Sequence, residues 1–161
     1  AWNVPAEEDD DDERRDIAAG ERIFNERTFT VVTPAGSFEG TCSGCHNTPD
    51  VGSSSSFRFF DVGVSAPERR SSQVPLYTFR HKTTGETIQT TDPGRALITG
   101  LWSDMNRFRA PSLRGLSSRP PYFHDGSARD LRAVVDHYDR HFAMELSSDE
   151  RRQLVSFLES L

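Results

Sequence analysis

The feature that most constrains this chain is the run Cys42-Ser43-Gly44-Cys45-His46, whose two cysteines are the only ones in 161 residues. In a C-x-x-C-H run, the two thiols are spaced to add across the two vinyl groups of a haem. The adjacent histidine can then ligate the iron from below the ring. The motif therefore predicts one covalently attached haem c, held by Cys42 and Cys45, with His46 as the proximal ligand.

Other uses of two cysteines fit this sequence less well. A thioredoxin-like dithiol needs a βαβ setting, whereas the flanking Gly40-Thr41 and Asn47-Thr48-Pro49 are typical of loops. A zinc site needs two more ligands at short spacing, and the nearest candidate, His81, lies far downstream. A disulfide would leave His46 unexplained. We therefore favour the haem interpretation.

Length and composition fit a single small domain built around a cofactor. The chain is 34% hydrophobic with a mean hydropathy of −0.64, which is low for a domain that must form its own core. A haem would supply the missing apolar mass. No apolar run approaches ~18 residues, so we expect no membrane span. No signal peptide is visible, and Ala1 resembles the start of a mature or trimmed chain.

Residues 1–15 form an acidic segment that we expect to be a flexible arm. It contains seven consecutive acids, Glu7 to Glu13. The chain has a net charge of −6, and these seven acids contribute −7, so all other residues together carry +1. Such a block repels itself and stays solvated. We favour a solubilising terminus over a docking arm for a basic partner, because no apolar residues accompany the charge.

Two terminal helices are predicted to cross. Ile17, Gly20 and Phe24 recur at helical spacing within a helix of about residues 16–26. Ser147-Ser148-Asp149-Glu150 forms a capping box that starts a last helix, whose apolar face carries Leu154, Leu158 and Leu161. A glycine followed four residues later by an aromatic lets another helix approach closely, so the crossing point should be Gly20.

The middle of the chain is predicted to be irregular apart from a hairpin. Residues 47–75 contain a serine run and an aromatic cluster, 57–60, that we expect to cover part of the haem. Residues 76–91 alternate well enough for a small inserted β-hairpin, followed by a short helix through Ile98. His81 lies in this hairpin and is interpreted as an exposed polar histidine rather than a ligand.

Three segments of the chain resemble a known family. Phe108-Arg109-Ala110-Pro111-Ser112-Leu113-Arg114-Gly115 and Pro121-Tyr122-Phe123-His124-Asp125-Gly126-Ser127 closely resemble the second haem domain of bacterial di-haem cytochrome c peroxidases and MauG enzymes. Ala19 to Phe24 is similar to the opening of that domain. The resemblance covers residues 16–161 and implies a cytochrome c-like helical domain.

The chain also departs from this family. Family members carry two haems, and the one that reacts with peroxide sits in a preceding domain. This sequence has one C-x-x-C-H run, so it resembles the electron-transfer half, and we expect no room for a second domain. The hairpin lengthens the segment before Pro111. The family's calcium site between domains is not carried over.

The resemblance implies that Tyr138 is the distal ligand. In the peroxidases the sixth ligand, often methionine, lies fourteen residues after the histidine of the P-Y-F-H segment, and MauG-like members have a tyrosine there. Fourteen residues after His124 is Tyr138. Independently, Leu131, Val134, Val135 and Tyr138 share one face of a helix that a capping box at Ser127–Asp130 would begin. A core tyrosine with a satisfied hydroxyl remains the alternative.

Two methionines compete with Tyr138 for the iron, because a thioether is a soft ligand. Met144, just before the last helix, is the stronger candidate, followed by Met105. His137 and His141 lie off the Tyr138 face of the helix and are expected to be exposed.

Three further residues are candidates for contacting the haem propionates. Arg109 and Arg114 could pair with a carboxylate through two hydrogen bonds. His124 is expected to hydrogen-bond either a propionate or the loop around Asp125.

Taken together, the sequence predicts a mostly α, cytochrome c-like domain around one covalent haem, with a small inserted β-hairpin and long loops. We expect an extracytoplasmic, most simply periplasmic, monohaem electron carrier, because haem is attached to C-x-x-C-H outside the cytoplasm. The alternative is a peroxidase-like or MauG-like enzyme or its electron-transfer subunit; haem-based sensing or assembly into a larger redox complex is a third. The expected partner is a redox protein, either a basic one or a separate peroxidatic subunit, with no nucleic acid involved.

Overall fold

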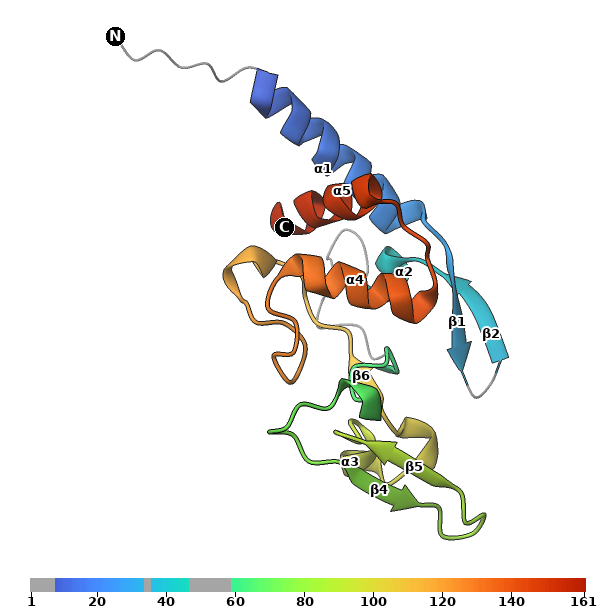
Figure 1. Ribbon diagram of the computed structural model, residues 1–161. Coiled ribbons are helices and arrows are strands. Elements are labelled where there is room, and N and C mark those ends of the chain that lie inside the picture. The colour runs from blue at the N-terminus through green and yellow to red at the C-terminus, as the bar shows by residue number, and fades with distance from the viewer. Residues whose placement is uncertain (1–7, 34–35, 47–58) are drawn as a thin grey trace. The chain divides into compact units, whose positions relative to one another are not determined.

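The computed structural model describes residues 8–33, 36–46 and 59–161 (Figure 1). The chain divides into two compact units. The terminal unit comprises residues 1–53 and 111–161, and the middle unit comprises residues 54–110. The sequence predicted one domain with a hairpin insertion of about 76–91, and this hairpin lies within the middle unit. Part of the predicted aromatic cluster, residues 57–58, lies outside the described residues.

The helices of the described residues are α1 (Glu8–Glu26), α2 (Cys42–His46), α3 (Ala96–Thr99), α4 (Leu131–Phe142) and α5 (Ser148–Glu159). The strands pair as antiparallel two-stranded sheets: β1 (Phe29–Thr33) with β2 (Gly36–Gly40), β3 (Phe59–Phe60) with β6 (Phe108–Arg109), and β4 (Tyr77–Arg80) with β5 (Thr87–Thr90). Short 3₁₀ helices cover Pro67–Arg69, Trp102–Asp104 and Leu116–Ser118.

Helix α1 starts at Glu8, eight residues before the predicted start near Asp16, so the predicted boundary of this helix is wrong. Two effects favour helix there. Acidic side chains are stabilising at a helix N-terminus, where the helix dipole is positive. Arg14 and Arg15 also offset the acidic charge, forming exposed i,i+3 ion pairs with Asp11 at 3.9 Å and Asp12 at 2.9 Å.

Helices α1 and α5 cross within the terminal unit, as predicted (Figure 1). The crossing is close because Gly20 is buried directly against α5. A Cβ atom added at Gly20 would lie 2.8 Å from Cβ of Phe157 and closer still to the Gln153 carbonyl. Arg152 of α5 also forms an ion pair with Asp16 of α1. The crossing therefore depends on two features: Gly20, which has no side chain to separate the helices, and the ion pair of Asp16 with Arg152 beside it.

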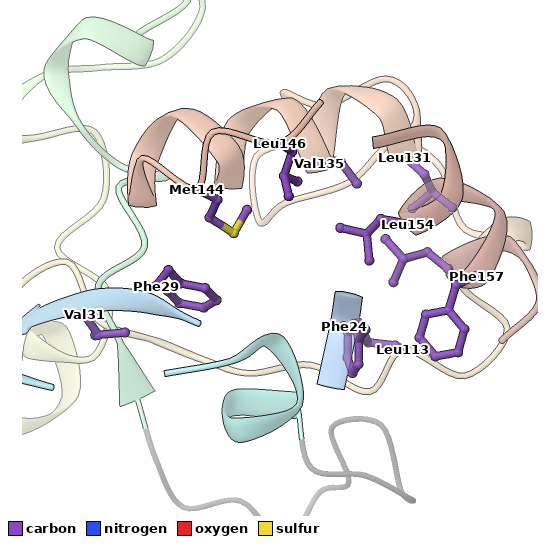
Figure 2. Close-up of a cluster of buried hydrophobic side chains, with 11 residues drawn as sticks. Phe24, Phe29, Val31, Leu113, Leu131, Val135, Met144, Leu146, Leu154 and Phe157 are labelled. Atoms are coloured by element: carbon purple, nitrogen blue, oxygen red, sulfur yellow. The ribbon is translucent and has the colours of Figure 1, made fainter. Parts of the chain in front are cut away.

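The core of the terminal unit is a cluster of buried apolar side chains from both ends of the chain (Figure 2). The buried members are Phe24, Phe29, Val31, Leu113, Leu131, Val135, Met144, Leu146, Leu154, Phe157 and Leu158. Phe29 and Val31 belong to the β1–β2 hairpin, which the sequence analysis did not predict. Its second strand, Gly-Ser-Phe-Glu-Gly, has too little β propensity to stand out.

The middle unit contains the predicted hairpin. Strands β4 and β5 pair from Tyr77↔Thr90 to Arg80↔Thr87, within the predicted range of 76–91. The short helix expected through Ile98 is α3, which ends at Gly100 in a left-handed conformation with φ of 67°. Buried Thr90 ties the hairpin to its unit by donating from Oγ1 to the carbonyls of Ser65 and Asp92.

No helix in the described ranges is both long enough and apolar enough to cross a membrane.

We expect Gly20→Ala to lower the free energy of unfolding by roughly 1–3 kcal/mol, because the added methyl group must push α1 and α5 apart. Urea unfolding followed by circular dichroism measures this. Exposed Ala18→Gly, two residues earlier, reports the helix-propensity effect alone, about 1 kcal/mol. If Gly20→Ala were instead stabilising, as alanine would be at an open helical position, the close crossing would be wrong.

Candidate haem-binding site

The C-x-x-C-H run forms the short helix α2, and Thr41 caps it. The Gly44 N–H donates to Oγ1 of Thr41 at 3.1 Å, as at a helix N-terminus. The Ser43 hydroxyl lies 3.0 Å from the same oxygen. Residues three apart on a helical turn lie on the same side, so the turn presents Cys42 and Cys45 together and places His46 immediately after them.

His46 is held by a contact from a distant part of the terminal unit. Its Nδ1 lies 3.2 Å from the carbonyl oxygen of Pro111, 65 residues later in the chain. A carbonyl can only accept, so Nδ1 must carry the proton and Nε2 presents its lone pair. Burial lowers the pKa of His46, and the bond to Pro111 only partly opposes this, so the ring is neutral. This is the tautomer in which a histidine ligates a metal through Nε2.

The two cysteines form no disulfide, and both are partly buried. Burial raises the pKa of Cys42 to about 12, and the neighbouring Cys45 adds to the shift. Cys42 also packs against the hydrophobic core. The Cys42 thiol is therefore uncharged and lies in apolar surroundings, which suits a hydrophobic cofactor better than a metal ion bound by a thiolate.

Helix α4 supplies Tyr138, but it starts differently from the prediction. Its N-cap is Asp130, whose carboxylate accepts from the Ala133 N–H at 2.8 Å. The predicted capping box at Ser127–Asp130 is wrong, because Ala128 is in an extended bridge with Tyr122 and cannot begin a helix. The expected apolar face is present, with Leu131 and Val135 buried.

Tyr138 is half-buried and packs against the same core as Cys42. Burial raises the pKa of its phenol, and the charges of Cys42 and Cys45 raise that pKa further. The hydroxyl forms no hydrogen bond with any described residue. The ring centroids of Tyr138 and Phe142 lie 6.0 Å apart, and those of Phe142 and Phe29 lie 4.4 Å apart, both pairs being stacked. The structure thus places the predicted distal residue and one predicted attachment residue, Cys42, against one core.

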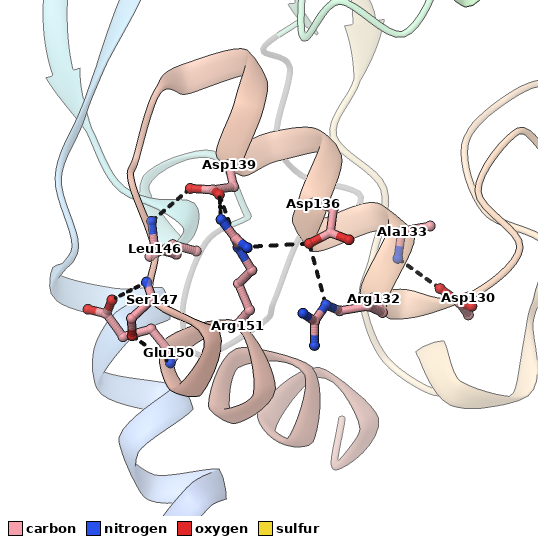
Figure 3. Close-up of polar contacts among 9 residues, drawn as sticks. All are labelled: Asp130, Arg132, Ala133, Asp136, Asp139, Leu146, Ser147, Glu150 and Arg151. Carbon is pink, nitrogen blue, oxygen red and sulfur yellow. Dashed lines mark hydrogen bonds and ion pairs between the residues drawn. The ribbon is translucent and has the colours of Figure 1, made fainter.

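The C-terminal end of α4 is locked by Asp139, the residue after Tyr138 (Figure 3). Its carboxylate accepts from the Leu146 N–H at 2.9 Å and from two nitrogens of Arg151, at 2.6 Å and 3.0 Å. The Asp139 side chain is only 7% exposed. This buried charge ties α4 to α5 through the tight turn between them and so fixes the backbone that carries Tyr138.

The two methionines lie in different units. Met144 is buried in the core of the terminal unit, near Phe29 (Figure 2). Met105 is buried in the middle unit.

The candidate propionate partners are all exposed side chains. Arg114 belongs to the terminal unit and Arg109 to the middle unit. His124 is close enough to Asp125 to affect its charge. Partial burial of Asp125 opposes ionisation, but hydrogen bonds from Ser127 and the nearby His124 outweigh it, so the pKa of Asp125 is lowered. Whether His124 hydrogen-bonds a propionate or this loop stays a prediction.

One expectation for α4 is wrong: His137 is buried at 6% exposure. Its ring lies edge-on to Phe123 at 5.0 Å and stacks on exposed His141 at 5.7 Å. The periodicity placed it off the Tyr138 face, but the loop carrying Phe123 covers that side of the helix.

The sequence did not predict three contacts of the site: the hydrogen bond of His46 with the Pro111 carbonyl, the bonds of Asp139 with Leu146 and Arg151, and the stacking of Phe142 on Tyr138. A backbone carbonyl is present at every residue, so the sequence does not mark the one that accepts. Asp139 had one detectable signal, a polar residue at a position adjoining the apolar face of a helix.

We compared the chain with known proteins. No family model matches it. It is 34% identical to cytochrome c551 peroxidase of Nitrosomonas europaea over 128 residues, covering 77% of this chain and 31% of that protein. It is 32% identical to the cytochrome c peroxidase IdrP2 of Denitromonas iodatirespirans, covering 76% and 36%. It is 46% identical to MauG of Methylorubrum extorquens over 65 residues, covering 34% and 18%. This chain belongs to the cytochrome c peroxidase and MauG family.

This membership confirms the family resemblance drawn from the P-S-L-R and P-Y-F-H-D-G segments. The chain spans about a third of the length of the cytochrome c peroxidases it matches. What it shares with them is therefore a domain-sized region.

We expect Asp139→Ala to lower the free energy of unfolding by about 1.5–3 kcal/mol, because it leaves the Leu146 N–H and the Arg151 guanidinium without their acceptor. Urea unfolding measures it. Asp136→Asn is the matched control, since Asp136 meets Arg132 and Arg151 in looser, more exposed pairs at 3.4 Å and 3.8 Å. The control should change stability by less than about 0.5 kcal/mol. Equal effects of the two substitutions would contradict a specific role for Asp139.

Proposed function

We propose that this chain is a c-type haem domain of a peroxidase-like or MauG-like oxidoreductase, with His46 and Tyr138 as the axial ligands. The observation that carries the proposal is the packing of Tyr138 and Cys42 against one core in the terminal unit, with Cys45 and His46 on the same short helix as Cys42. A bound haem supplies one-electron redox chemistry and, at an open coordination position, a site for peroxide.

The residues present fit a haem. Cys42 and Cys45 lie on one helical turn and form no disulfide, as attachment through two thioether bonds requires. Cys42 packs against the apolar core, and the ring centroids of Phe24 and His46 lie 6.3 Å apart. Arg114 and His124 remain candidate partners for the propionates, as does Arg109.

His46 is pre-arranged for the proximal position. The Pro111 carbonyl fixes both the tautomer and the orientation of the ring, and a hydrogen bond from Nδ1–H increases the basicity of Nε2. Thr41 holds the helical turn that precedes the ring. This contact, which leaves Nε2 available, supports His46 as the proximal ligand.

Tyr138 supports a MauG-like rather than a methionine-ligated site. Its oxygen lacks a hydrogen-bond partner among the described residues, and its side chain packs against the same core as Cys42. A hard anionic oxygen prefers ferric iron, and a cation favours the deprotonated phenol. Met144 remains the competing ligand and is tested below.

The comparisons favour an oxidoreductase over the simple electron carrier that the sequence analysis preferred, because the matched relatives are peroxidases and MauG. In this proposal, the domain exchanges electrons with a redox partner, such as a separate peroxidatic subunit or a basic protein. It works outside the cytoplasm, where haem is attached to C-x-x-C-H.

Covalent attachment is tested by denaturing the purified protein and extracting it with acidified organic solvent. We expect the colour to stay with the polypeptide, because both cysteines form thioethers. Cys42→Ala and Cys45→Ala should each leave one thioether or block maturation. Colour that leaves the wild-type polypeptide would contradict attachment.

The axial ligand is tested by comparing ferric optical and electron paramagnetic resonance spectra of wild type, Tyr138→Phe and Met144→Leu. We expect only Tyr138→Phe to change the spectra, open the site to peroxide and raise the reduction potential. The rise should be on the order of 0.1 V, since axial ligands set haem potentials over ~0.8 V. If only Met144→Leu changes the spectra, and the wild type shows a sulfur-to-iron charge-transfer band, then Met144 is the ligand and the MauG-like proposal fails.

A further inference from the structure

The middle unit has a charge opposite to that of the rest of the chain. Residues 54–110 contain eight lysines and arginines against five aspartates and glutamates, a net charge of +3. The whole chain carries −6, so the terminal unit carries −9. A basic unit inserted into an acidic protein favours association with acidic molecules.

The middle unit also has a hollow of about 390 Å³, lined by residues 79–82 of the β4–β5 hairpin and by parts of 93–105. Trp102 and Met105 contribute to its lining. The Trp102 ring is held in place: its Nε1–H donates to Glu86 at 3.1 Å, and His81 lies edge-on to it at 5.3 Å. A fixed tryptophan in a hollow is typical of the anchor points of protein interfaces.

The apolar surface continues beyond the hollow. Leu97 is 71% exposed, Ile98 is 89% exposed and Leu101 is 57% exposed, and Leu97 and Leu101 line the hollow. Three such residues within five positions form a patch rather than scattered apolar side chains. The apolar area is thus wider than the hollow, which favours a protein segment over a small molecule.

Two exposed cations border this patch. Arg80 and Lys82 line the hollow, and among the described residues neither forms an ion pair. The nearby acids are already engaged, because Glu86 accepts from Trp102 and Asp104 pairs with Arg95 at 3.1 Å. Glu86 keeps its negative charge and offsets part of the rim, but Arg80 and Lys82 together still leave the rim net positive.

From this combination we infer that the groove around Trp102 is a docking site for an acidic protein partner, which inserts an apolar side chain while flanking carboxylates meet Arg80 and Lys82. The inference is independent of the haem proposal, since every residue it uses lies in the middle unit. It also differs from the expectation of a basic partner for the acidic N-terminal segment.

The test is a nuclear magnetic resonance titration of the purified protein, residues 1–161, with the cofactor content with which it is isolated. Trp2 and Trp102 are the two tryptophans, so a Trp2→Phe background leaves the ¹⁵N-indole signal of Trp102 alone. The probes are the capped hexapeptides Glu-Glu-Leu-Phe-Glu-Glu and Lys-Lys-Leu-Phe-Lys-Lys at low salt. We expect the acidic peptide to shift the indole signal saturably and the basic peptide to leave it unchanged.

Variants localise the effect. Arg80→Gln and Lys82→Gln should each weaken binding of the acidic peptide about threefold, because each removes one rim ion pair. Arg70→Gln is the matched control: it removes the same charge from the middle unit outside the hollow and should leave binding unchanged.

Three outcomes would overturn the inference. One is no saturable shift with the acidic peptide. Another is equal shifts with both peptides or equal weakening by the control, which would make the groove a general apolar surface. The last is a shift that depends on protein concentration without peptide, which would make a second copy of the chain the occupant.

Discussion

The close crossing of α1 and α5 at Gly20 is the constraint on which the terminal unit depends. Because Gly20 has no side chain, the two ends of the chain pack directly against each other and share the core that includes Phe24 and Phe157. The hairpin after α1 then leads to the Cys42–His46 turn, and the segment before α5 supplies α4 with Tyr138. The two halves of the candidate site thus come from segments that the helix crossing brings together, and the stack of Phe29 on Phe142 joins them as well.

Within that frame, the site is ordered by backbone groups and by one buried charge. The Pro111 carbonyl determines which nitrogen of His46 is available, and Asp139 fixes the end of the helix that carries Tyr138. Neither residue would touch a haem directly. Both act by limiting the conformations open to the side chains that would.

Sequence reasoning succeeded where the signal is local. Two local patterns predicted features that the structure contains. The spacing of Gly20 and Phe24 predicted the close helix crossing, and Ser147 with Glu150 predicted the capping box. It failed where the deciding partner is distant. The burial of His137 depends on a loop that folds over α4, and the bond of His46 depends on a carbonyl 65 residues away. Every residue carries a backbone carbonyl, so the amino-acid sequence does not indicate which carbonyl will accept a given hydrogen bond.

The hydrogen bond between His46 and Pro111 closes a loop of the chain that contains the whole middle unit, residues 54–110. The entropy lost on closing a loop grows only with the logarithm of its length, and each doubling costs about 0.6 kcal/mol. An insertion at this point can therefore grow or shrink by tens of residues with little thermodynamic effect on the proximal histidine. That makes the segment between the attachment turn and Pro111 a permissive position for acquiring new surfaces.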